Sequence, residues 1–160
     1  MTHSIPAEAH DRLLARLGEL EDQQALRTLM LRAWRALDLK DWDAWISCWS
    51  EDAVFEFEPW GTLRGREAIL ELVREAETGY PAMQHHILNM HFEVTGDRAR
   101  GYGYMWFLAV QHAERPDDHF AMGGPYAWSY RRGADGWRLT EQRLGVSWTR
   151  GQDESMVPQR

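Results

Sequence analysis

The stretch LDLKDWDAWISCWSEDAVFEF, residues 37–57, contains the end of one helical pattern, a capped second helix and the start of a strand. Asp41 has the residue type and position of an N-cap, so we expect a helix from Trp42 to Ser50 after it. Asp38 lies at the C-terminal end of the preceding helix, where the helix dipole disfavours a negative charge by a few tenths of a kcal/mol up to about 1. Asp38 is therefore a candidate functional residue, and the alternative is an aspartate that caps or solvates the turn.

Outward from this stretch, helices come first and strands afterwards. Apolar residues at spacings of three and four predict a helix from about Glu19 to Asp38, and Ala7–Leu17 predicts a separate short helix on the outside. A strand follows at about Ala53–Glu58, and a third helix at about Arg66–Glu77. Four further strands are expected after Pro81, in HHILNMHFEV, ARGYGYMWFLAVQH, YAWSYRR and GWRLTEQRLGVSW.

This order predicts an α+β fold in which a curved antiparallel sheet wraps over about three helices. We expect residues 1–18 to form an N-terminal extension, 19–151 a single domain, and 152–160 a disordered tail. Within HHILNMHFEV, alternation predicts one face for four apolar residues. These residues are Leu88, Met90, Phe92 and Val94.

Composition narrows the class of protein. The net charge is -7 without a basic cluster, so nucleic acid is not an expected partner. Cys48 is the single cysteine, which excludes an internal disulfide and a cysteine-built metal site, and no metal is expected. No apolar run reaches a membrane span and no signal-peptide core is present, so we expect a cytoplasmic protein without a membrane partner. Nine tryptophans indicate a core or pocket rich in flat apolar surface.

Asp38 needs a partner if it points inward. Met30, Trp34 and Asp38 are four residues apart and lie along one helical line that borders the apolar stripe. His85 and His86 begin a strand and face opposite sides of the sheet, so we expect one of them to face the helices. A carboxylate bound to an imidazole makes a general base, although adjacent histidines at a strand end are equally compatible with a structural role.

The sequence resembles the SnoaL-like branch of the nuclear transport factor 2-like superfamily over about Leu20–Gly151. The resemblance is carried by LDLKDWDAWISCWSEDAVFEF, LRGREAI, MQHHILNMHFEVTGDRARG and GADGWRLTEQRLGVSW. It implies a cone-shaped curved sheet closed by helices around a deep apolar pocket. The chain is most similar to scytalone dehydratase, bile acid 7α-dehydratase and lindane dehydrochlorinase.

The resemblance also implies site residues. Asp38 matches the aspartate of those enzymes and His85 the histidine, with His86 one residue away, and Arg143 is near an arginine that assists in some relatives. An exposed strand arginine is the alternative for Arg143. Where the dehydratases carry a tyrosine on the first helix, this chain has Ala33 and Trp34, so the particular reaction does not carry over.

Several aromatic and acidic side chains elsewhere in the sequence are further candidates for the site. Trp34, Trp106 and Tyr126 are predicted pocket walls that bind substrate together with His86, although core packing is the better explanation for any single one of the three aromatics. Ketosteroid isomerase shares the fold and places its base on the first strand, where Glu58 precedes a proline. A solvated strand face explains Glu56 and Glu58 better.

Together these features predict a cofactor-free lyase (dehydratase-like) or an isomerase or cyclase acting on a hydrophobic, cyclic small molecule. We expect an Asp38 oxygen within hydrogen-bond distance of a His85 ring nitrogen. Exposed strand aromatics predict a homodimer or homotrimer built on the sheet. Two other classes of function remain: the non-catalytic small subunit of an aromatic-ring-hydroxylating dioxygenase, and a small-molecule binding protein.

Overall fold

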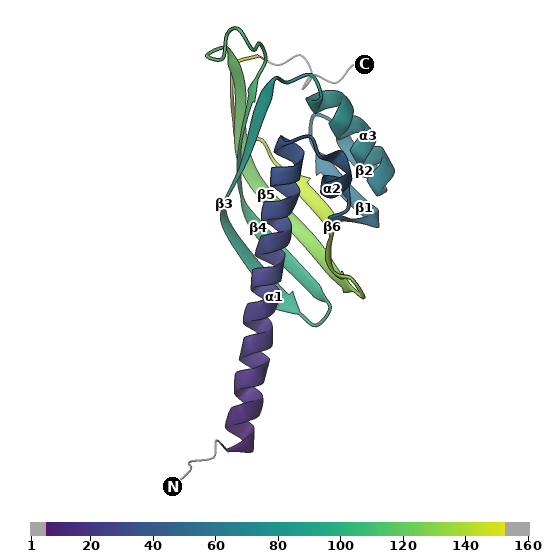
Figure 1. Cartoon of the computed structure of the whole chain (residues 1–160), viewed down its shortest axis with the longest axis vertical. Coiled ribbons are helices and arrows are strands. Elements are labelled where there is room, and N and C mark those ends of the chain that lie inside the picture. The colour runs from purple at the N-terminus through teal and green to yellow at the C-terminus, as the bar shows by residue number, and fades with distance from the viewer. Residues whose placement is uncertain (1–5, 153–160) are drawn as a thin grey trace.

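The computed structural model describes residues 6–152 and has the predicted helices and strands in order, with one additional short strand at Gly61–Arg64, where a turn was expected (Figure 1). The helices are α1 (Ala7–Asp38), α2 (Trp42–Ile46) and α3 (Arg66–Glu77). The strands are β1 (Trp49–Phe57), β2 (Gly61–Arg64), β3 (Ala82–Thr95), β4 (Arg98–Val110), β5 (His119–Gly133), β6 (Gly136–Leu144) and β7 (Trp148–Arg150).

The strands form one curved, unclosed sheet in the order β2-β1-β6-β5-β4-β3, and β7 pairs with β5. Every pairing is antiparallel except that of β1 with β6, which is parallel. α1 lies along one face of the sheet. In Figure 1, α2 and α3 lie beside the upper end of α1. The predicted α+β class and the curved sheet packed on three helices are therefore confirmed.

The core lies between α1 and the inner face of the sheet. α1 buries one stripe against β3 and β6, as its apolar spacing predicts. Beyond the stripe, an aromatic cluster joins α2 to β1, with Trp49 edge-on to both Trp45 and Phe55. The buried residues of the α1 stripe are Leu26, Leu29, Met30, Ala33, Trp34, Ala36 and Leu37.

The helix boundaries differ from the prediction in two places. α1 is one continuous helix from Ala7, rather than two helices that meet near Gly18. A helical glycine costs only about 1 kcal/mol relative to alanine, which neighbouring turns can absorb. α2 ends at Ile46 because Trp49 already begins β1, and Asp41 caps α2 as predicted, accepting from the Ala44 amide at 3.1 Å. Within residues 6–152, no helix is long and apolar enough to cross a membrane.

A bulge in β3 changes which side chains face inward. The pairing of β3 with β4 shifts between Leu88 and His91, and Asn89 there has a left-handed φ of 54°. The extra residue moves every side chain beyond it to the other phase of the pleat. Met83 and Phe92 are buried, whereas Leu88 is exposed, which corrects its predicted place beside Phe92.

The predicted tail lies, apart from Gln152, outside the described residues.

Gly124 of β5 lies where the segment after β6 crosses the sheet. A Cβ atom at this position would overlap the Gly145 carbonyl group and lie 3.0 Å from the Ser147 amide nitrogen, both of which are backbone. Because backbone cannot rotate away, Gly124→Ala is expected to lower the free energy of unfolding by about 1–3 kcal/mol or more. Urea denaturation monitored by tryptophan fluorescence measures this, with Gly133→Ala, which meets open space, as control. Equal midpoints for the two variants would contradict the prediction.

Candidate active site

Asp38 and His85 meet where the end of α1 approaches the start of β3. Asp38 Oδ1 is 2.7 Å from Nδ1 of the His85 ring, which is the contact expected from the sequence. The backbone N–H of His85 also donates to the same carboxylate, at 3.0 Å to Oδ1 and 3.1 Å to Oδ2. One aspartate therefore fixes both the strand position and the ring orientation of one histidine.

The turn after α1 holds this arrangement in place. Lys40 adopts a left-handed φ of 57°, and its Nζ donates to the Thr78 carbonyl at 2.8 Å and to the Tyr80 carbonyl at 2.5 Å. Those carbonyls belong to the segment that joins α3 to β3. The ends of α1 and α3 and the start of β3 are thus tied together around His85.

The His85 ring is buried: its side chain is 5% exposed, against 25% for Asp38. One face of the ring packs on Phe107, with ring centroids 4.5 Å apart. Nδ1 is occupied by Asp38, so Nε2 is the nitrogen left for other contacts. In a low-dielectric setting of this kind, each remaining polar neighbour has a large effect on the ring.

Glu77 is such a neighbour, and sequence reasoning missed it. It is the last residue of α3, 4% exposed, with Oε1 3.8 Å from His85 Nε2. Burial raises the pKa of Glu77 to about 7, with His85 opposing the rise and Asp38 adding to it. The signal was available, because Ile69, Val73 and Glu77 are four residues apart on the buried side of α3.

These groups surround a small inner pocket. Its free volume is about 30 Å³, and its walls combine α1, α2, α3 and the inner face of the sheet. The lining is largely aromatic and aliphatic, with His85, Glu77, Tyr126 and Gln142 as its main polar members. The remaining lining residues are Trp34, Leu37, Trp45, Phe55, Phe57, Trp60, Val73, Met105, Met122 and Leu144.

A second hollow lies on the other side of the pair, between α1 and β3. It has a volume of about 320 Å³ and includes Asp38, His85, Trp34 and Met90 in its walls. Trp34 and His85 line both hollows and therefore form the wall between them. Asp38 therefore borders the outer hollow, and His85 borders both the outer hollow and the smaller inner pocket.

A model of the SnoaL-like domain matches residues 18–143. The chain belongs to the SnoaL-like domain family. No functionally curated protein matches the sequence.

Solved structures share the fold of this SnoaL-like domain. A Novosphingobium aromaticivorans protein named as a candidate scytalone dehydratase has a TM-score of 0.75 at 19% identity, covering 86% of this chain and 90% of that one. The hexachlorocyclohexane dehydrochlorinase LinA type 2 has a TM-score of 0.70 at 22% identity, covering 90% and 93%. A candidate aromatic ring hydroxylase, also from N. aromaticivorans, has a TM-score of 0.74 at 24% identity, covering 86% and 97%. At these identities the likeness shows the fold alone.

Two further predicted pocket residues do line the inner pocket of the SnoaL-like domain. Trp34 and Tyr126 meet edge-on with ring centroids 6.1 Å apart. The Tyr126 hydroxyl donates to Met105 Sδ at 3.0 Å, so it is already engaged inside the pocket. Gln142, which the sequence reading missed, accepts from Trp128 Nε1 at 3.2 Å.

Three predicted site residues lie on the outer face of the sheet instead. His86 contacts Gln84, and Trp106, 51% exposed, stacks edge-on with Trp148. Arg143, whose side chain is 62% exposed, pairs with Glu56 and Glu141. Alternation along each strand is the reason, because His86, Trp106 and Arg143 each adjoin a residue that points inward. The structure therefore places none of the three in the pocket.

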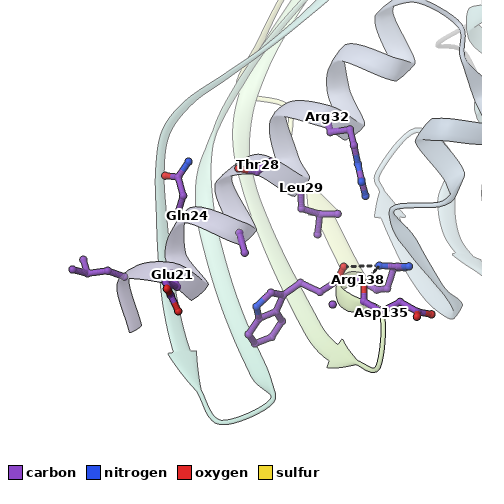
Figure 2. Close-up of a pocket in the computed structure, with 11 residues that line it drawn as sticks. Glu21, Gln24, Thr28, Leu29, Arg32, Asp135 and Arg138 are labelled. Atoms are coloured by element: carbon purple, nitrogen blue, oxygen red, sulfur yellow. Dashed lines mark hydrogen bonds between the residues drawn. The ribbon is translucent and has the colours of Figure 1, made fainter. Parts of the chain in front are cut away.

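A groove of about 600 Å³ opens elsewhere, between α1 and the turn from β5 to β6 (Figure 2). Glu21, Gln24 and Arg32 line it from α1, Asp135 from the turn and Arg138 from the start of β6. Its arginines are partly engaged: Arg138 Nη1 donates to the Trp137 and Asp135 carbonyls, and Arg32 to Cys48 Sγ. The groove is larger than the inner pocket but lies away from the Asp38–His85 pair.

Proposed function

We propose that this SnoaL-like domain is an enzyme in which His85, oriented by Asp38, is the general base for a hydrophobic, cyclic small molecule. The 2.7 Å contact between Asp38 Oδ1 and His85 Nδ1 carries the proposal. A carboxylate only accepts hydrogen bonds, so Nδ1 carries the hydrogen and Nε2 of the neutral ring holds the lone pair. Asp38 also stabilises the imidazolium that forms when Nε2 takes a proton.

The proposed chemistry is removal of a hydrogen from carbon next to an activating carbonyl group. Either a leaving group then departs from the neighbouring carbon, as in a hydro-lyase, or the proton returns elsewhere, as in an isomerase or cyclase. A positioned base of this type contributes about 10²–10⁴-fold to rate. The solved homologues named as dehydratase and dehydrochlorinase make elimination the first choice, although their identity to this chain is low.

Substrate binding requires the inner pocket to open. Its volume of about 30 Å³ has room for one or two water molecules, whereas ligand sites are typically about 300–1,000 Å³. Trp34 separates this pocket from the 320 Å³ outer hollow, and Met105 and Met122 are flexible side chains in its wall. We propose that a ring enters from the outer hollow by displacing the Trp34 indole, which brings it against His85.

The assay that tests this function is exchange of the hydrogens next to a carbonyl. Cyclic ketones such as cyclohexanone are incubated with the protein in D₂O, and deuterium incorporation is followed by NMR. A base at His85 predicts exchange faster than buffer alone. A binding protein or a scaffold subunit predicts no acceleration, and a scaffold also predicts copurification with a large iron-containing partner. Absence of exchange across one- and two-ring ketones would contradict the proposal.

We also propose that the outer face of the sheet forms a homodimer or homotrimer. Tyr102, Tyr104 and Trp106 alternate outward along β4 and are each more than half exposed, and Leu88 pairs opposite Tyr104. A patch of this kind usually marks an interface. Light scattering is expected to show an oligomer at micromolar concentration that Trp106→Arg shifts towards monomer. Leu39→Arg, at an exposed leucine outside the sheet, is the control, and a monomeric wild type would contradict the proposal.

A further inference from the structure

Glu77 is a buried carboxyl group for which packing gives no reason. It occupies the last position of the buried stripe Ile69–Val73–Glu77, where leucine or methionine would fill the same space without desolvating a carboxyl group. The C-terminal end of a helix also disfavours a negative charge. Its Oε2 atom is buried and has no hydrogen-bond partner among residues 6–152.

Among the described residues, none of the nearest charged groups forms a hydrogen bond with the Glu77 carboxyl group. Lys40 lies near enough to lower its pKa, but the Lys40 ammonium is bound to the Thr78 and Tyr80 carbonyls. Asp38 is committed to His85 and opposes a second negative charge. From the sheet, Tyr126 and Gln142 face the same pocket, each with a different hydrogen-bond partner. Glu77 therefore faces His85 Nε2 without a bond to hold it.

We propose that Glu77 is a second catalytic residue, which protonates the leaving oxygen of a β-hydroxy carbonyl substrate while His85 removes the α-hydrogen. This inference rests on the proposed function of the Asp38–His85 pair. It narrows the substrate class, because a hydroxyl group must leave as water, whereas a halide or a stabilised anion leaves without a proton. Elimination of water then becomes the reaction for which this pocket is equipped.

The proton balance closes within the pocket. His85 Nε2 takes the α-hydrogen as a proton, the electrons of that C–H bond form the C=C bond, and the C–O bond breaks as its oxygen takes the Glu77 proton. Water and an unsaturated carbonyl compound are the products, with His85 as imidazolium and Glu77 as carboxylate. After release, a water molecule in the pocket takes the imidazolium proton and passes one to Glu77, whose Oε1 is 3.8 Å from Nε2, so both groups are reset.

The distance between the two groups suits this division of roles. Nε2 and Oε1 are too far apart to form a hydrogen bond with each other, so neither is sequestered by the other. They are close enough to reach neighbouring atoms of one substrate. Burial also raises the pKa of Glu77 to about 7, so at neutral pH a substantial fraction of Glu77 is in the protonated form that can donate.

Two matched substrates test the role of Glu77. 3-Hydroxycyclohexanone needs a proton on its leaving oxygen, whereas 3-(4-nitrophenoxy)cyclohexanone releases a stable coloured anion. Glu77→Gln, which keeps the size but cannot donate a carboxyl proton, is expected to slow the hydroxy ketone about 10²-fold more than the ether. Glu75→Gln, at an exposed position on the same helix, is the control. Equal slowing of both substrates, or of neither, overturns the inference while leaving the His85 base in place.

A measurement without substrate completes the test. Difference infrared spectroscopy is expected to show a protonated carboxyl band that titrates near neutral pH in the wild type and is absent in Glu77→Gln. If the wild type has no such band, Glu77 is ionised and cannot be the donor, which overturns the inference even if neither ketone is turned over. Failure of the proposed function can be told apart from failure of the Glu77 role. If His85 is not the base, hydrogen exchange is absent or persists in His85→Ala.

Discussion

His85→Ala is expected to slow both hydrogen exchange and elimination by about 10²–10⁴-fold. The variant removes Nε2, the atom that takes the proton, while the apolar lining of the pocket remains. Exchange into cyclohexanone in D₂O and kcat/KM on the matched cyclohexanones measure the loss. His86→Ala is the control, because its neighbouring ring lies on the outer face of the sheet and contacts Gln84. Near-equal rates for the two variants would remove His85 from the mechanism.

Asp38→Asn is expected to lose activity on a similar scale while the protein still folds. The aspartate accepts from both Nδ1 and the backbone N–H of His85, and its two oxygens serve three contacts. Asparagine has one oxygen, so its NH₂ group faces a donor unless the ring changes tautomer, which moves the lone pair away from the pocket. Circular dichroism checks the fold, and kcat the chemistry.

The neighbouring aspartate supplies the control for this substitution. Asp43 lies in the first turn of α2, where its charge interacts favourably with the helix dipole, so Asp43→Asn is expected to change kcat little. If Asp38→Asn and Asp43→Asn were equally active on a substrate that the wild type accepts, orientation of His85 by Asp38 would not contribute to catalysis.

Local signals in the sequence predicted much of this molecule. The N-cap at Asp41 and the bounds Arg66–Glu77 follow from short-range chemistry, because a cap or an amphipathic stripe is encoded by residues a few positions apart. The charge of Asp38 at the end of an apolar stripe is a signal of the same kind. It predicted an inward carboxylate that needs a partner, and the structure places that partner at 2.7 Å.

The register between strands that are far apart in the sequence accounts for the residues whose predicted facing was wrong. A one-residue difference exchanges inward for outward positions, and such shifts arise from bulges that the pattern does not show. Asn89 bulges β3 and turns Leu88 outward, and the pairing of β5 with β6 shifts between Ser129 and Tyr130. Gln142 therefore faces the pocket, while the adjacent Arg143 faces solvent.

Glu77 and Asp38 occupy the same kind of position in their helices, and this position is visible in the sequence. Each is a carboxyl group at the last residue of a helix, at the end of a buried apolar stripe. Both the helix dipole and desolvation oppose that placement. Because two such residues converge on one histidine, a role in function explains their presence better than a contribution to stability does.

The same placement makes stability depend on pH. The pKa of Glu77 is about 7 in the folded protein, against 4.5 for an unperturbed glutamate. Between these values the folded state binds more protons than the unfolded state, so the free energy of unfolding falls as pH rises through this window. The loss is on the order of 3 kcal/mol, complete above the folded-state pKa and absent below the unfolded-state one.

Glu77→Gln is expected to remove this loss, because an amide stays neutral at every pH. The variant should therefore become more stable relative to the wild type from pH 5 to pH 8, by roughly 2–3 kcal/mol. Urea denaturation at the two pH values measures the difference, and Glu75→Gln, exposed on the same helix, should show no such trend. A constant difference between Glu77→Gln and the wild type would mean that Glu77 is ionised in the fold. A gain in stability together with a loss of dehydration would show that the protein keeps a destabilising carboxyl group for its chemistry.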